Sequence, residues 1–153
     1  TRHDEVLSKP VGEPPTPTGV DDWSRDGRYL ILRSIHPTRQ FDIWVLPLNA
    51  QKPDEWKPFP YLQTEFSEWL GRLSPDGRWL AYTSNESGQN EIYVQPFPTP
   101  GNKSVVSNNG GDLPVWSRDG EELYFVSADG RMMAVEVKSG SRSEIGVPSS
   151  KCR

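Results

Sequence analysis

The residues of this sequence whose types and spacing could support chemistry are a set of aspartates, each followed by glycine. Carboxylates bind Ca²⁺ when they recur at alternate positions of an Asp-x-Asp-x-Asp-Gly loop, and no such loop occurs in the sequence. Asp-Gly is also a strong tight-turn signal, because glycine adopts a positive φ without strain. We therefore predict turns, and no metal site, at Asp26, Asp76, Asp119 and Asp129.

The sequence contains few groups for nucleophilic or acid–base catalysis. The two histidines, His3 and His36, have no second ligand at metal-binding spacing and no motif that would pair them with a nucleophile. The Gly-x-Ser-x-Gly motif of serine hydrolases is absent, and Ser87 and Ser139 precede glycines in segments typical of turns. We predict no catalytic residues, no bound cofactor and no enzymatic activity for this chain.

The composition argues against several classes of partner. The 153 residues carry a net charge of −4 without a run of Lys or Arg, so binding to nucleic acid lacks its main source of affinity. No apolar stretch approaches the roughly 20 residues of a membrane-spanning helix, and we predict no membrane insertion. Cys152 is the single cysteine, so the fold has no internal disulfide. The 15 Pro and 13 Gly indicate many short strands joined by tight turns.

The Asp-Gly pairs belong to a longer unit that occurs three times. In each copy a Ser-x-Asp-Gly turn stands between a preceding apolar residue and a following apolar and aromatic segment. The copies recur at intervals of about 40 to 50 residues, which is the length of a four-stranded propeller blade. The three copies cover residues 23–32, 73–82 and 116–125.

The repeat predicts the positions of the strands. The turn joins the first strand of each blade to a second strand, and a third strand follows as a mixed apolar run, as expected when both faces of a sheet are covered. The predicted second strands are 29–35, 79–85 and 123–128, the third strands 42–48, 91–97 and 131–137, and the fourth strands 56–62, 103–108 and 143–149. The predicted fold class is all-β: a β-propeller segment of three four-stranded antiparallel blades.

This reading divides the chain into a leading segment and three blades within a single propeller-type domain. Residues 1–20 comprise a strand at 5–9, interpreted as the last strand of an earlier blade, and a Pro-rich linker at 10–20. Blade 1 covers residues 21–62, blade 2 residues 63–109 and blade 3 residues 110–150. Residues 63–70 form either one helical turn or a connection between blades, and we expect the connection.

These motifs resemble the TolB-like, WD40-like propeller repeat, whose hallmark is Ser-Pro-Asp-Gly-Lys/Arg followed by an aliphatic and aromatic strand. Within that group they are most similar to the propeller regions of bacterial serine/threonine kinases. The segments that carry this resemblance are 62–66, 74–79, 90–98 and 114–120. The resemblance implies a rigid ring without chemistry of its own, used for contact with a protein or ligand, often in the periplasm or otherwise outside the cytoplasm.

Three blades do not close a ring, because closed propellers have at least four. An open arc leaves a sheet face uncovered at each end, and neither end copy shows the polar outer face that usually caps a repeat array. We therefore expect a homodimer whose three plus three blades close a six-bladed ring. The strand at residues 5–9 would then complete the third blade of the partner.

The sequence offers one group of candidate ligand-binding residues, Asp21, Glu65, Glu68 and Asp112. All four fall where the last strand of one blade connects to the first strand of the next, so they are expected at one mouth of the channel. An acidic rim of this kind favours a cationic ligand, or a protein or peptide partner. We predict an interaction or sensing module of a larger bacterial regulatory protein. The alternative is the gating propeller of a prolyl-oligopeptidase-like hydrolase whose catalytic domain lies outside this chain.

Overall fold

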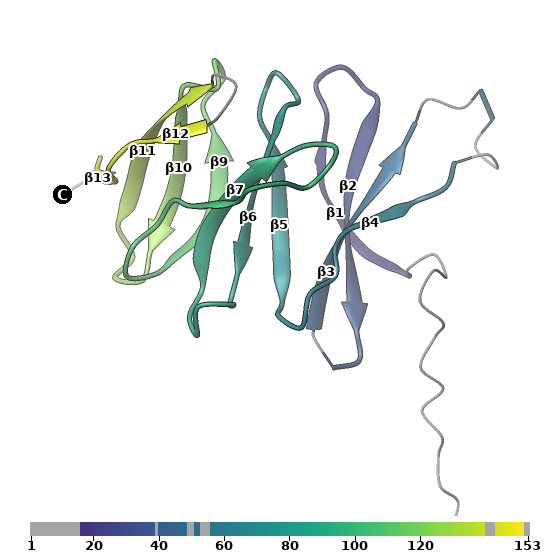
Figure 1. The fold of residues 1–153 in the computed structure, drawn as a ribbon, viewed down its shortest axis with the longest axis horizontal. Helices are drawn as coiled ribbons and strands as arrows, with labels where there is room; N and C mark the ends of the chain where they lie inside the picture. Colours follow the sequence, from purple (N-terminus) through teal and green to yellow (C-terminus); the bar gives the residue numbers. More distant parts are fainter. Residues whose placement is uncertain (1–15, 39, 49–50, 53–55, 140–142, 152–153) are drawn as a thin grey trace, which may run out of the picture.

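The structure is a computed structural model that describes residues 16–38, 40–48, 51–52, 56–139 and 143–151 (Figure 1). These residues form three separate antiparallel sheets, and the strands of each sheet pair in the order in which they occur in the chain. The sheets stand side by side along the sequence (Figure 1). The predicted fold class, all-β with three four-stranded blades, is confirmed.

Blade 1 contains β1 (Pro17–Trp23), β2 (Tyr29–His36), β3 (Gln40–Pro47) and β4 (Phe59–Leu62). Blade 2 contains β5 (Glu68–Leu73), β6 (Trp79–Ser84), β7 (Glu91–Pro96) and β8 (Ser104–Val105). Blade 3 contains β9 (Gly111–Trp116), β10 (Glu122–Ser127) and β11 (Met132–Ser139), and its outer position is divided between β12 (Ser143–Ile145) and β13 (Ser149–Ser150), which both pair with β11.

Most strand boundaries lie within one or two residues of the predicted ones, and the larger differences are at the starts of blades 1 and 2 and in the fourth strands. β1 begins at Pro17, inside the segment predicted to be a linker. β5 begins at Glu68, so the connection between blades 1 and 2 ends at residue 67, and it contains no helical turn. The fourth strands β4 and β8 are shorter than predicted. The strand predicted at residues 5–9 lies outside the described residues, and the edge of β11 that it would complete in a partner already pairs with β12 and β13.

The Ser-x-Asp-Gly turns are built from their own side chains. The hydroxyl of Ser74 donates to Asp76 Oδ1 at 2.6 Å and accepts the main-chain N–H of Trp79 at 3.0 Å. Gly77 has φ 70°, a conformation that costs glycine little. The same pattern recurs after Ser24 and Ser117. The predicted turns are therefore confirmed, and each one is held by contacts among about six consecutive residues.

Apolar side chains fill the two spaces between the blades. Because neighbouring residues of a strand point to opposite faces of the sheet, blade 2 contributes alternate side chains to both spaces. Towards blade 1 it presents Leu80 and Tyr82, and towards blade 3 it presents Trp79 and Ala81. All six residues of β6 are buried as a result. The mixed apolar pattern of the repeat reflects this two-sided burial.

The free face of blade 1 is apolar. Trp23, Leu32 and Trp44 occupy the repeat positions that Leu73, Tyr82 and Tyr93 occupy in blade 2, where these side chains pack against blade 1. Leu32 and Trp44 are themselves buried, whereas Trp23 leaves 62% of its surface exposed. The described part of the chain supplies no preceding blade against which Trp23 could pack.

The free face of blade 3 carries a charged pair that the corresponding face of the middle copy lacks, in contrast to the expectation that the end copies resemble the middle one. In the repeat, Glu122 occupies the position of Tyr29 in blade 1 and of Trp79 in blade 2. The side chains of Tyr29 and Trp79 each pack against the following blade. The carboxylate of Glu122 forms an ion pair of 2.9 Å with Lys151, which follows directly after β13. A charged pair is common at the outer face of a terminal repeat, but the same face also carries Tyr124 and Met132, of which Met132 is 42% exposed. The two ends of the arc therefore differ in chemistry.

The close approach of β5 to blade 1 yields a stability prediction. A Cβ atom on Gly71 would lie 2.7 Å from Cγ2 of Ile31, a fully buried side chain. Overpacking of this kind costs about 1–3 kcal/mol, so Gly71→Ala should lower the free energy of unfolding by that amount in denaturant titrations. Gly19→Ala is the control, because its Cβ would meet only the flexible guanidinium of Arg33. Equal stability of the two variants would contradict this packing.

Candidate functional site

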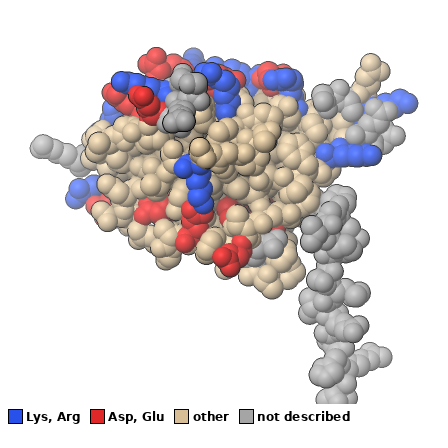
Figure 2. Space-filling model, viewed as in Figure 1, with Lys and Arg blue, Asp and Glu red and all other residues tan. Residues whose placement is uncertain are grey.

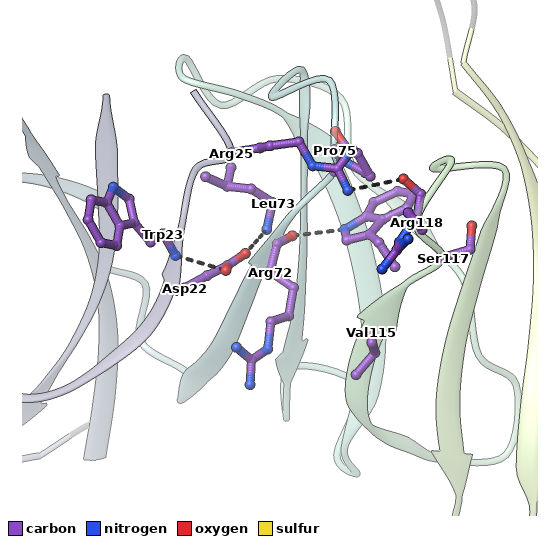
Figure 3. Close-up of a pocket in the computed structure, with 11 residues that line it drawn as sticks. Asp22, Trp23, Arg25, Arg72, Leu73, Pro75, Val115, Ser117 and Arg118 are labelled. Carbon is purple, nitrogen blue, oxygen red and sulfur yellow. Dashed lines mark hydrogen bonds between the residues drawn. The ribbon is translucent and has the colours of Figure 1, made fainter. Parts of the chain in front are cut away.

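A hollow of about 450 Å³ lies where the first strands of the three blades end and the Ser-x-Asp-Gly turns begin. We call it the inner hollow (Figure 3). Every blade contributes to it, and its lining consists of Asp22, Trp23, Arg25, Arg72, Leu73, Ser74, Pro75, Val115, Trp116, Ser117 and Arg118. A surface shared by three blades exists only in the folded arc.

The blades converge at the inner hollow. Nη2 of Arg25, in blade 1, donates a hydrogen bond of 3.2 Å to the main-chain oxygen of Arg118, in blade 3 (Figure 3). Blades 1 and 3 therefore approach each other at this edge, although blade 2 stands between them in the sequence. The sheets fan outward from an axis near β1, β5 and β9, which is the geometry of a propeller.

A bulge in the first strand of each blade positions the side chains of the hollow. The pairing of β1, β5 and β9 with their second strands shifts register at the same place in the repeat. Leu70 and Leu113 have φ of 54° and 59° at these bulges. A bulge bends a strand and redirects the residues that follow it, and here those residues include Asp22, Arg72 and Val115. Gly71 and Pro114 lie within the bulges of β5 and β9 and were the available signals for them in the sequence.

The lining of the hollow is positively charged, although the whole chain has a net charge of −4. Three arginines face one carboxylate, that of Asp22. Both oxygens of Asp22 are engaged, Oδ1 with the N–H of Trp23 at 2.8 Å and Oδ2 with the N–H of Leu73 at 2.7 Å. The bond to Leu73 ties blade 1 to blade 2. Asp22 therefore serves the fold, and the arginines determine the charge of the hollow.

The hydroxyls of the hollow belong to the turns. Ser74 and Ser117 each donate to the aspartate of their own turn, at 2.6 Å in both cases. The hydrogen bond from Ser117, together with the N–H of Glu121, lowers the pKa of Asp119. A hydroxyl that donates to an ionised carboxylate of its own turn has no histidine base to accept its proton. The arrangement stabilises the turns and offers no activated nucleophile.

The four residues predicted to bind a ligand do not line the inner hollow. Asp112 lies near the start of β9, where its Oδ1 accepts the hydroxyl of Thr83 at 2.9 Å. Asp21 is buried, with Oδ1 at 3.7 Å from Nε of Arg33, and burial raises its pKa despite the opposing charge of Arg33. Glu65 is exposed in the connection between blades 1 and 2. A role of these residues in binding stays a prediction.

Of the four candidate residues, Glu68 has the pKa that departs furthest from its ordinary value. Its side chain is 1% exposed at the start of β5, and its Oε1 accepts the hydroxyl of Thr64. No side-chain or main-chain donor among the described residues reaches Oε2. Burial raises the pKa of Glu68 to about 7, and the neighbouring charge of Asp42 adds to this shift against the opposing Thr64 hydrogen bond. Glu68 is thus buried within the fold instead of projecting from an acidic rim.

The two edges of the arc nevertheless differ in charge. The upper edge in Figure 2, where the Ser-x-Asp-Gly turns lie, carries Lys and Arg side chains among Asp and Glu. The lower edge carries mainly Asp and Glu. Glu65, Glu68 and Asp112 lie at or just before the starts of β5 and β9, the strand ends opposite the turns, whereas Asp21 lies within β1 next to Asp22 of the hollow. The arginines of the inner hollow were missed, although Arg25 and Arg118 share one position of the repeat, which was the available signal.

No protein-family model matches the chain. An uncharacterized protein of Agrobacterium fabrum is 26% identical over 113 residues, which are 70% of this chain and 35% of that protein. A solved structure assigned as TolB from Agrobacterium tumefaciens superposes with a TM-score of 0.64 at 21% identity, covering 84% of this chain and 48% of the other. The chain has a TolB-like β-propeller fold.

Two further solved structures support that fold. TolB from Acinetobacter baumannii gives a TM-score of 0.61 at 16% identity, and the match covers 86% of this chain and 32% of that protein. A protein of Bacteroides fragilis assigned as a 6-phosphogluconolactonase gives 0.55 at 15% identity and covers 88% and 37%. At these identities the likeness concerns the fold alone. The chain spans less than half the length of each of these relatives.

Within the described ranges, no group of three or more His, Cys, Asp or Glu side chains is arranged to hold a metal ion. In the same part of the chain, no helix is long and apolar enough to cross a membrane.

The buried carboxyl of Glu68 predicts a pH dependence of stability. Because its pKa rises from 4.5 to about 7, the folded protein holds a proton between these pH values that the unfolded chain releases. The free energy of unfolding should therefore fall as pH rises through this window. Glu68→Gln should remove the dependence and exceed the native protein in stability at pH 8, by an amount on the order of 1–3 kcal/mol. At pH 4 the two proteins should be similar.

Denaturant titrations at pH 4, 6 and 8 measure this effect. Glu65→Gln provides the control, since Glu65 is exposed and its substitution should leave the curve of stability against pH unchanged. Parallel curves for Glu68→Gln and the native protein would show that Glu68 is ionised in the fold at neutral pH.

Proposed function

We propose that this chain is a non-catalytic propeller-type module that binds a protein or a small ligand, as the sensing or scaffold part of a larger bacterial regulatory protein. The observation that carries the proposal is the inner hollow, to which all three blades contribute exposed or half-buried side chains. Clefts at the meeting point of repeats are common ligand sites. The hollow lies at one mouth of the channel that a complete ring would enclose.

The chemistry of the hollow supports binding without catalysis. Its two serine hydroxyls are committed to their turns. His36, the histidine of the described residues, lies at the far end of β2, where its Nδ1 accepts the N–H of Thr38 at 3.2 Å. No base is therefore placed beside a hydroxyl of the hollow. The connection to bacterial kinases remains a proposal that rests on the repeat motifs described above.

We also propose that a second copy of the chain covers the apolar face of blade 1 and completes a six-bladed ring. The repeat places Trp23, Leu32 and Trp44 where the other blades pack against a preceding blade. Val20 and Trp23 leave 60% and 62% of their surfaces exposed on β1. Leu73 is buried at the position of Trp23 and Trp116 is half-buried there, so the exposed indole of Trp23 indicates a missing neighbour.

Binding at the inner hollow can be tested on the full chain by NMR. Titration of the ¹⁵N-labelled protein with a library of small fragments of mixed charge should shift amide signals of Leu73, Ser74, Trp116 and Ser117, with no turnover of ester, peptide or phosphoester substrates. Val115→Trp should abolish these shifts by filling the hollow. Val147→Trp, at an exposed position outside the hollow, is the control. Shifts that cluster at Asp112 and Glu68, or measurable turnover, would contradict the proposal.

Self-association can be tested by light scattering. The native chain should have about twice the monomer mass of 17.3 kDa at micromolar concentration. Trp23→Glu should shift it towards the monomer, because a carboxylate on the covered face lacks a partner. Val105→Glu, at a similarly exposed position of blade 2, should leave the mass unchanged. A folded native monomer at all concentrations would overturn the second-copy proposal.

A further inference from the structure

We infer that the inner hollow binds a small molecule that carries a terminal phosphate, with Arg25 and Arg118 as its ligands. The inference rests on the proposed binding function and names the ligand class. A phosphate monoester carries a charge of about −1.5 to −2 at neutral pH and three strong acceptor oxygens. Two guanidinium groups match this charge, and each can donate to more than one phosphate oxygen.

The arginines of the hollow are set apart from the other arginines on the same edge. Arg28 and Arg78 also follow Ser-x-Asp-Gly turns, but each forms an ion pair with the aspartate of its own turn, at 2.7 and 2.8 Å. Arg25 and Arg118, in contrast, form no ion pair with a carboxylate of the described residues. Their charges are therefore not neutralised within the turns, and an anion in the hollow would be their counterion.

Arg25, Arg72 and Arg118 come from three different blades, and two of them are held by the main chain. Arg25 donates to the main-chain oxygen of Arg118 at 3.2 Å, which fixes the Arg25 guanidinium at the turn that carries Arg118. Arg72 donates to the main-chain oxygen of Asp21, and its guanidinium points away from Arg25 (Figure 3). A guanidinium that is already held in place loses less side-chain freedom when an anion binds.

No carboxylate of the lining competes for the arginines. Asp22 is the acidic residue of the hollow, and both of its oxygens accept main-chain N–H groups. Pro75 occupies the position in blade 2 that Arg25 and Arg118 occupy in blades 1 and 3. It adds neither a charge nor an N–H donor between them. The space between the two arginines is therefore open to an acceptor from outside.

An apolar wall beside the arginines would take the rest of the ligand. Trp116 is half-buried, and its Nε1 donates to the main-chain oxygen of Arg72 at 2.9 Å, which fixes the indole ring. Leu73 and Val115 line the same hollow. A volume of about 450 Å³ is within the range of small-molecule sites and too small for a folded domain. A phosphate joined to a compact apolar or ring-containing body fits these features.

The test uses the full chain and four probes in isothermal titration: phenyl phosphate, inorganic phosphate, benzoate and benzyl alcohol. Phenyl phosphate should bind most tightly, phosphate and benzoate more weakly, and benzyl alcohol not measurably. Arg25→Ala and Arg118→Ala should each weaken phenyl phosphate by about tenfold or more, because a hydrogen bond to a charged group is lost. Arg28→Ala and Arg78→Ala are matched controls and should change the affinity by less than about twofold, as expected for arginines already paired within their turns.

A second pair of variants tests the site while keeping both arginines in place. Pro75→Glu places a carboxylate between Arg25 and Arg118 and should abolish phosphate binding, whereas Pro75→Gln should retain it. Amide spectra of each variant verify the fold. Tight binding of phenyl phosphate that is unaffected by Arg25→Ala, Arg118→Ala and Pro75→Glu would overturn the inference.

The outcomes separate this inference from the proposed function. If benzyl alcohol or a cationic fragment binds the hollow and phenyl phosphate does not, the ligand class is wrong and the binding function stands. If benzoate binds as tightly as phenyl phosphate, selectivity for phosphate is overturned. If phenyl phosphate binds through the arginines and phenol is released, the anion site stands and the non-catalytic function fails. If no probe or fragment of any charge binds, both proposals fail.

Discussion

The burial of each sheet between two others is the constraint on which this structure depends. A four-stranded sheet with apolar residues on both faces is stable only when both faces are covered. Blade 2 meets this condition, and the six residues of β6 and five of the six in β7 are buried. The end blades meet it on one side only. Their free faces have different chemistry, because blade 1 keeps apolar residues there while blade 3 carries Glu122 paired with Lys151.

The same radial packing creates the inner hollow. Sheets that pack face to face with the twist of a propeller converge at their first strands, so side chains that are far apart in sequence meet at one edge. Arg25 and Arg118 meet there because the rotation from blade to blade brings the ends of blades 1 and 3 together over blade 2. The bulges of β1, β5 and β9 direct Asp22, Arg72 and Val115 into this edge. The chemistry of the hollow is therefore a consequence of how the blades are arranged.

Acidic and basic groups are used differently at the two edges of the arc. Glu68, at the start of β5, and Asp21, within β1, are buried, and burial raises the pKa of each. At the upper edge the aspartates of the turns are exposed or nearly so, and hydrogen bonds within the turn lower the pKa of Asp26 to about 2. The carboxylates of Asp21, Glu68 and the turns thus serve the fold, whereas Arg25 and Arg118 form no ion pair with a carboxylate of the described residues.

The sequence alone determined the features whose physical causes are local. The Ser-x-Asp-Gly turn satisfies its own hydrogen bonds within a few residues, and the period of the repeat sets the number of blades, so the all-β class and the three sheets could be predicted. The burial of Glu68 could not be predicted, because it depends on how the connection at residues 63–67 folds back over the start of β5. The inner hollow also required the tertiary structure. Arg25 and Arg118 are 93 residues apart, and only the angle between packed sheets brings them within a hydrogen bond of each other.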